Sequence, residues 1–158
     1  MCAMFKKEIP KILSFKEPLS NYSLVSKVGP FLFFAGQLAY DPERKRVIRG
    51  YEDLPDEEGR RLATGRTTVD EKEGPIIAQA WFIYSNLKKI LEELGSSLDD
   101  IIHTHIYMVN FERDFPGFER VRSLFFKKAP PTSTAVEVSR LAVKDCLIEI
   151  EPIALAKD

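Results

Sequence analysis

The stretch that most restricts the fold lies near the C-terminus, where apolar and acidic residues alternate. Residues 147–153 read LIEIEPI, which puts two isoleucines on one side of an extended chain and Glu149 and Glu151 on the other. This alternation is typical of a strand in a sheet with one covered and one open face. With the preceding apolar run, it predicts two closing strands, at 134–141 and 146–154.

Upstream, β-rich runs alternate with helical periodicity. Val28-Gly29-Pro30 separates two apolar runs and predicts a hairpin. Apolar residues at helical spacing follow Pro75, which suits a first helical position, and end at Gly95, which suits a left-handed C-terminal cap. The other predicted elements, in chain order, are an extended piece at 11–15, strands at 22–27 and 31–38, a helix at 75–94, a strand at 101–110 and a helix at 116–128.

Residues 41–74 differ from the rest because they are dense in charge and rich in glycine. We interpret them as an excursion with a short strand at 45–48 and a helical turn at 55–62. Segments of this length in a compact domain are usually functional or mobile. The 158 residues fit one domain, at 19–158, preceded by an N-terminal arm at 1–18.

The predicted order of elements is strand, strand, excursion, helix, strand, helix, strand, strand. Two helices on one face of such a sheet would make an α+β fold. Phe31 to Phe34 are apolar on both sides of their strand, and two helices can cover only one side. The open apolar face is therefore expected to find a partner.

The C-terminal pattern P-x-x-[ST]-x-V-E-V-x-R-L-x-x-x-D-x-x-I-E-I-E-x-I-A resembles the signature of the RidA/YjgF/YER057c family. The resemblance runs over 22–154, except that the link corresponding to 41–74 is much shorter in RidA-like sequences, which marks an insertion. It implies the chorismate-mutase-like fold, a mixed sheet with two helices on one face, assembled as a homotrimer. It also implies ligand sites in the clefts between subunits.

The resemblance assigns roles to several residues one by one. Glu149 matches a glutamate credited with positioning the hydrolytic water. Tyr22 matches a tyrosine at the start of the first strand, and Gly36, in F-A-G-Q, matches a glycine whose backbone can approach a ligand closely. Ala35 replaces a common serine, and Glu119 stands where an asparagine is common. Each also has a plainer interpretation, as part of an ordinary strand, bulge or interface.

Ser133 is the main departure from the family pattern. Relatives that hydrolyse imino acids carry an arginine there, two residues after the proline and just before the hydroxyl residue that matches Thr134. An arginine holds a carboxylate with two parallel hydrogen bonds, whereas a serine cannot offset the charge. Either the ligand has no carboxylate at that end, or another arginine replaces the missing one. The candidates in or beside the insertion are Arg46, Arg49, Arg60, Arg61 and Arg66.

Two functions fit this pattern. The first is a RidA-like hydrolase of enamines or imines with altered specificity, needing no metal or organic cofactor. The second is a non-catalytic trimer that binds a small metabolite or regulates a partner through the same cleft. Ser133 favours binding alone, and Glu149 favours hydrolysis.

Composition argues against other classes. The formal net charge is -1, from 23 basic and 24 acidic residues, which gives no reason to expect nucleic acid or a membrane as partner. Cys2 and Cys146 do not make a disulfide framework, and neither has an evident base partner for nucleophilic chemistry. The start of the chain lacks the apolar core of a signal peptide, so a cytoplasmic location is expected.

His103 and His105 share one face of a predicted strand. Such a pair can bind zinc, but a catalytic site needs a third protein ligand and the chain has no other histidine. We therefore expect no metal, and two polar residues that line a cleft or an interface.

Overall fold

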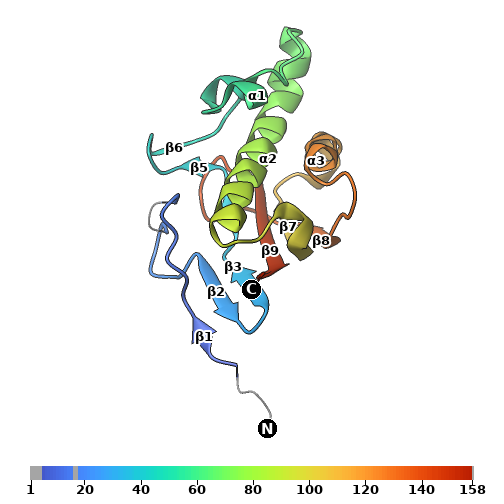
Figure 1. Cartoon of the computed structure of the whole chain (residues 1–158). Helices are drawn as coiled ribbons and strands as arrows, with labels where there is room; N and C mark the ends of the chain where they lie inside the picture. Colours follow the sequence, from blue (N-terminus) through green and yellow to red (C-terminus); the bar gives the residue numbers. More distant parts are fainter. Residues whose placement is uncertain (1–4, 16–17, 158) are drawn as a thin grey trace.

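A mixed sheet forms the centre of the computed structural model, which describes residues 5–15 and 18–157 (Figure 1). The strands run in the order β1-β2-β3-β9-β7-β8, and β4 also pairs with β9. β7 and β8 are parallel, and every other pair in this sheet is antiparallel. The strands are β1 Lys7–Glu8, β2 Val25–Val28, β3 Phe31–Phe34, β4 Gln37–Leu38, β7 Ile101–Met108, β8 Thr132–Glu137 and β9 Ile148–Leu155.

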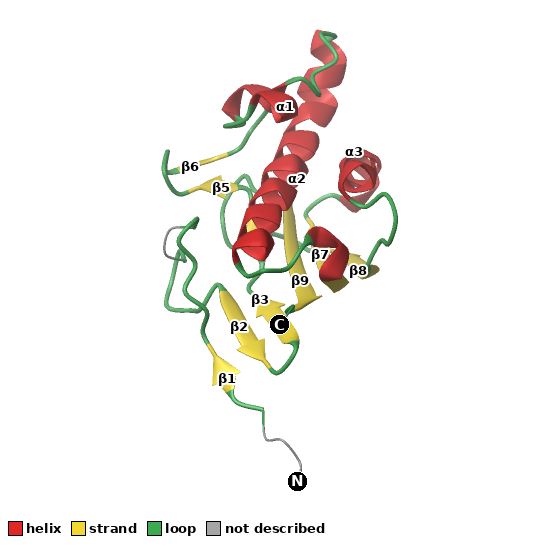
Figure 2. Cartoon of the chain, in the orientation of Figure 1, coloured by secondary structure: helices red, strands yellow, loops and turns green. Residues whose placement is uncertain are grey.

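Two helices, α2 Thr67–Glu93 and α3 Phe111–Phe125, lie over one face of this sheet (Figure 2). Inward residues of the strands, among them Leu32, Ile106 and Ile150, are fully buried beneath them. This confirms the predicted α+β fold with two helices on one face, and the predicted hairpin, in which β2 pairs with β3. A short 3-10 helix, η2 Leu98–Asp100, leads into β7.

Both helices begin earlier than their prolines suggest. Pro75 and Pro116 were expected at the first turn, but both lie inside a helix. α3 begins after Asn110, whose side chain accepts a hydrogen bond from the backbone N–H of Arg113 at 3.0 Å. This is ordinary N-terminal capping, and the buried faces of both helices offset the backbone hydrogen bond that each proline removes.

The first turns of α2 are fixed by Asp70. Its carboxylate accepts hydrogen bonds from the backbone N–H groups of Thr64 and Gly65, both at 2.9 Å. At the other end Gly95 has a φ of +72°, and Ser96 donates to the Leu91 carbonyl at 2.8 Å. The predicted left-handed cap at Gly95 is confirmed.

Residues 41–66 are ordered against α2, and residues 67–74, expected to belong to the same excursion, are the first turns of α2 itself. Residues 41–66 contain α1 Glu57–Arg60 and the 3-10 helix η1 Tyr51–Asp53, and a small two-stranded sheet joins β5 Tyr40–Asp41 to β6 Arg46–Val47. The indole N–H of Trp81 on α2 donates to the Asp56 carboxylate at 3.0 Å. The segment is therefore built into the helical layer.

Two smaller predictions were wrong. The extended piece expected at 11–15 is irregular, and the strand in that region is β1 instead. Strict alternation along the strand predicted at 101–110 puts Ile102 on the same face as Thr104, which is buried. The pairing of β7 with β9 shifts between Ile101 and His103, however, so Ile102 is exposed and Ile101 is buried. The division into an arm at 1–18 and one domain stays a prediction, and residues 1–4, Cys2 among them, lie outside the described ranges.

Candidate functional site

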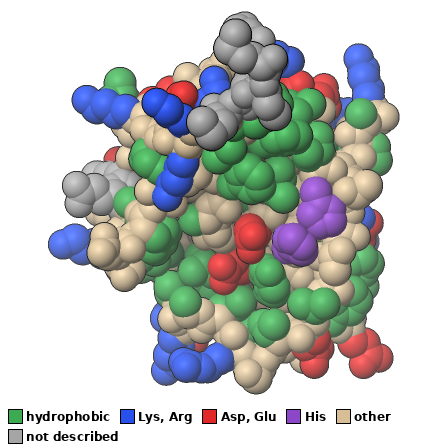
Figure 3. All heavy atoms as spheres, turned by 90° about the horizontal axis from the view of Figure 1, so that it is seen from below, with side chains coloured by type: hydrophobic (Ala, Val, Ile, Leu, Met, Phe, Trp, Pro, Cys, Tyr) green, Lys and Arg blue, Asp and Glu red, His purple; other side chains and the backbone are tan. Residues whose placement is uncertain are grey.

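The face of the sheet opposite the helices is open and largely apolar. Phe31 and Phe33 of β3 point to it and are 38% and 44% exposed. Figure 3 shows apolar side chains surrounding a pair of acidic side chains, with the two imidazoles of the chain beside them. A polar group set into an apolar surface is a usual form of ligand site.

Glu149 lies near the middle of this face. On β9 its cross-strand neighbours are Tyr107 of β7 and Leu38 of β4. Partial burial raises the pKa of the Glu149 carboxyl, and the negative charge of Glu151 raises it further. A raised pKa makes a carboxylate a better proton acceptor than an ordinary one, which suits acid–base chemistry.

Gly36 allows the Glu149 side chain to lie where it does. A Cβ atom at residue 36 would stand 1.8 Å from Glu149 Oε1, far inside contact distance. Next to it, the backbone of Ala35 donates to the Leu24 carbonyl at 2.9 Å and accepts from the Gln37 side chain at 2.7 Å. The break between β3 and β4 is therefore held in a fixed shape against the carboxylate.

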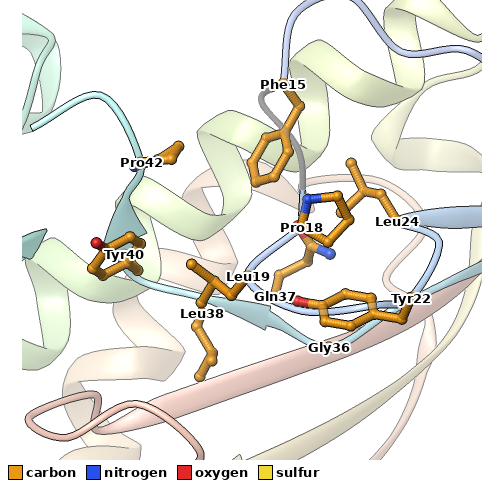
Figure 4. Close-up of a pocket in the computed structure, with 10 residues that line it drawn as sticks. All are labelled: Phe15, Pro18, Leu19, Tyr22, Leu24, Gly36, Gln37, Leu38, Tyr40 and Pro42. Atoms are coloured by element: carbon orange, nitrogen blue, oxygen red, sulfur yellow. The ribbon is translucent and has the colours of Figure 1, made fainter. Parts of the chain in front are cut away.

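Tyr22 reaches the same place from the loop before β2. It lines a small pocket of about 40 Å³ together with Gly36 and Gln37 (Figure 4). Its ring is 46% exposed, so the neighbours within one chain cover only about half of it. Three of the predicted residues, Tyr22, Gly36 and Glu149, thus come together from separate segments.

Further polar residues surround Glu149. The Tyr107 hydroxyl donates to Glu151 Oε2 at 3.4 Å, and His105 Nδ1 lies 3.9 Å from Glu151 Oε1. Burial raises the pKa of Tyr107, and the charges of Glu151 and Glu149 add to this. We call Glu149, Glu151, Tyr107 and His105 the carboxylate cluster.

Tyr107 and Glu151 were not predicted as site residues. Alternation along β9 placed Glu151 on the same face as Glu149, whereas Tyr107 reaches Glu149 only through the pairing of β7 with β9.

His103 and Cys146 have surroundings typical of residues that support the structure rather than take part in a reaction. His103 Nδ1 lies 2.8 Å from the Thr132 hydroxyl, which itself donates to the Ile102 carbonyl at 2.9 Å. Burial raises the pKa of the Cys146 thiol to about 11, which disfavours the reactive thiolate. Among the described residues, no group of three or more His, Cys, Asp or Glu could hold a metal ion.

Ser133 and Glu119 lie on the other side of the sheet. Ser133 is the neighbour of buried Thr104 on β7, and its hydroxyl lies 3.4 Å from Nη1 of Arg122. Arg122 Nη2 is 2.5 Å from Glu119 Oε1. We call Arg122, Glu119 and Ser133 the arginine cluster. Thr134, one residue on, pairs with His105 on the open face.

The arginine beside Ser133 therefore comes from α3, and the sequence did not single it out. Of the proposed replacements in residues 41–74, Arg46 pairs with Asp53 and Arg49 with Asp145. Arg61 pairs with Glu57 in its own helix. The signal that could have revealed Arg122 is its position one helical turn after Glu119, already a candidate.

The mixed sheet with two helices on one face is the fold of the RidA/YjgF proteins. The family model described as Endoribonuclease L-PSP matches residues 14–156, so the chain belongs to this family. A RutC family protein of Pyrococcus abyssi is 36% identical over 151 residues, which cover 96% of this chain and 94% of the relative.

Two further likenesses bear on fold and function. A solved structure from Klebsiella pneumoniae, described as a candidate endoribonuclease, matches with a TM-score of 0.81 and 33% identity, over 86% of this chain and 100% of that one. A 2-iminobutanoate/2-iminopropanoate deaminase of Dermatophagoides farinae is 24% identical over 139 residues, 88% of each chain.

Proposed function

We propose that the protein hydrolyses a small imine or enamine, with Glu149 as the residue that activates water. The observation that carries this proposal is the carboxyl of Glu149, which is half-buried, has a raised pKa and lies against Gly36 beside the Tyr22 pocket. The likeness to an iminobutanoate deaminase supports the reaction class. No cofactor is needed for this chemistry.

The reaction balances with Glu149 as the one proton carrier. Its carboxylate takes a proton from water while the water oxygen bonds to the imine carbon, and the carboxyl then protonates the nitrogen. In the second half the carbinolamine hydroxyl gives its proton to the Glu149 carboxylate, which passes it to the amino nitrogen, and the carbon–nitrogen bond breaks so that ammonia leaves. The product is the corresponding oxo compound. Acid–base catalysis of this kind contributes roughly 100- to 10,000-fold.

We further propose that the working form is a homotrimer, assembled through the open sheet face. Large apolar side chains on that side of the structure are exposed, and exposed apolar area of this extent is typical of an interface. They are Phe31, Phe33, Ile102, Val136 and Leu155. Light scattering should give about three times 18.1 kDa, and Phe33→Glu, which places a charge there, should give single chains. A wild-type monomer at micromolar concentration would contradict the assembly.

The test of function is ammonia release from freshly generated 2-imino acids. Glu149→Gln keeps the size of the side chain but cannot take a proton, so the rate should fall at least 100-fold. Glu112→Gln, on an exposed part of α3, is the matched control and should leave the rate unchanged. Equal rates for Glu149→Gln and wild type would refute the proposed role. RNA cleavage, measured in the same preparations, should not depend on Glu149.

The second candidate is a non-catalytic binder of a small metabolite. The presence of a neutral Ser133 where hydrolytic relatives have an arginine favours it. Saturable binding of a metabolite without ammonia release from any imine would support this candidate over hydrolysis.

A further inference from the structure

Arg122 is held in a fixed position between α3 and the edge strand β8. Its guanidinium lies over the Phe118 ring, 5.4 Å from the centroid, and Nη2 pairs with Glu119. Nη1 donates to the Ser133 hydroxyl at 3.4 Å. The side chain is 24% exposed, so the cation is ordered yet reachable from solvent. Two contacts leave most of the five N–H donors of a guanidinium free.

Two buried hydroxyl groups, on residues that neighbour Ser133 and Phe118, have no hydrogen-bond partners among the described residues. Thr104, fully buried on β7, is the cross-strand neighbour of Ser133. Tyr84, fully buried on α2, stacks on the Phe118 ring with 6.2 Å between the ring centroids, and Arg122 lies over that same ring. Buried hydroxyls normally have partners, so unpaired ones mark a place where a polar ligand or water can bind.

We propose that Arg122 binds the carboxylate of the substrate, and that it supplies from α3 the positive charge that Ser133 does not supply from β8. This deepens the proposed hydrolysis and rests on it, because it names the residue that holds the charged end of the substrate. A guanidinium presents parallel donors that match the two oxygens of a carboxylate. The Ser133 hydroxyl lies within reach of the same guanidinium and adds a neutral donor.

The charge of the site also limits its ligand. Glu119 already offsets the positive charge of Arg122. A ligand with one negative charge can share the guanidinium, whereas a phosphate with two would lie against the Glu119 carboxylate and be repelled. The arginine cluster therefore fits a small monocarboxylate.

The test is calorimetric titration with 2-oxobutanoate, a stable carboxylate probe with the shape of an imino acid. Arg122→Gln should weaken binding roughly 10- to 100-fold, the usual cost of losing charged hydrogen bonds. The matched control is Arg120→Gln, because Arg120 lies on the same helix but pairs with Glu73. It should bind as wild type does. Equal binding by Arg122→Gln, or none by wild type, would overturn the inference.

A rescue variant separates binding from a purely structural role, since Arg122 also packs on Phe118. Adding Ser133→Arg to Arg122→Gln returns a guanidinium to the same place and should restore binding. If the double variant melts as wild type does but still fails to bind, Arg122 does not act through its charge.

The two proposals also fail in different ways. Binding of 2-oxobutanoate that depends on Arg122, without ammonia release from imines, would refute hydrolysis and keep this inference. Hydrolysis of imino acids with a KM unchanged by Arg122→Gln would refute this inference and keep hydrolysis.

Discussion

The carboxylate cluster and the arginine cluster lie on opposite faces of the same sheet. Glu149, Tyr107 and Val136 are aligned across three strands and face the open side, while Ser133, three residues before Val136 on β8, faces the helices. One cluster offers a proton carrier without a nearby cation, and the other a cation beside a neutral hydroxyl. The proposed hydrolysis needs both a proton carrier and a group that holds the carboxylate, so together with the proposed role of Arg122 it predicts a site shared by two copies of the chain.

The strongest test of this comparison is to mix two inactive variants. Glu149→Gln and Arg122→Gln should each lose most activity. In hybrids assembled from equal amounts by joint refolding, a cleft is intact when Glu149 comes from one copy and Arg122 from its neighbour. This happens for about one cleft in four, so about a quarter of wild-type activity should return. No recovery from properly mixed trimers would mean that both residues act within one chain.

Gly36→Ala tests whether the position of the Glu149 side chain in the carboxylate cluster matters for turnover. The added methyl group would meet the end of the Glu149 side chain, which can move aside. Imine turnover should therefore fall by about 10-fold or more, while the free energy of unfolding changes by only about 1 kcal/mol. In a Glu149→Gln background the same substitution should cost little further activity, because the two changes act on one group. Additive losses in turnover would contradict the contact.

Glu119→Gln tests the arginine cluster, and it should strengthen ligand binding where the other substitutions weaken function. Removing the carboxylate that competes for Arg122 should tighten 2-oxobutanoate binding several-fold, since a close like charge is removed. Titration calorimetry at low ionic strength measures this. Weaker binding would show instead that Glu119 orients Arg122 more than it competes with the ligand.

The smallest expected effect concerns the pH dependence of stability. The folded-state pKa of Glu149 is raised, so the folded chain holds that proton more tightly than the unfolded chain. The protonated Glu149 contributes its full share to the free energy of unfolding below the ordinary pKa of 4.5. That contribution is lost as the pH rises through the pKa of the folded state. Glu149→Gln should therefore be more stable than wild type at neutral pH, and the difference should shrink below pH 4.5. Thermal melting across this range checks the sign.

Strand alternation and helix periodicity accounted for much of the fold. They predicted the hairpin, the open face of β9 and the cap at Gly95, because each depends on neighbouring residues. Pro75 and Pro116 led to a wrong predicted start for each helix. The sequence shows the backbone hydrogen bond that a proline removes, but not the contacts that offset its loss. Asn110 caps α3, and the segment around Asp56 packs on α2.

The sequence by itself determined the class of fold, because strand alternation and helical periodicity are local properties, and its resemblance to the RidA/YjgF family made Glu149, Gly36 and Ser133 candidates. Only the tertiary structure decided which groups meet. It placed Glu149 against Gly36 and Arg122 beside Ser133, contacts that depend on how β4 pairs with β9 and how α3 packs on β8. Such contacts join residues far apart in the chain, so their distances follow from the packing of whole elements.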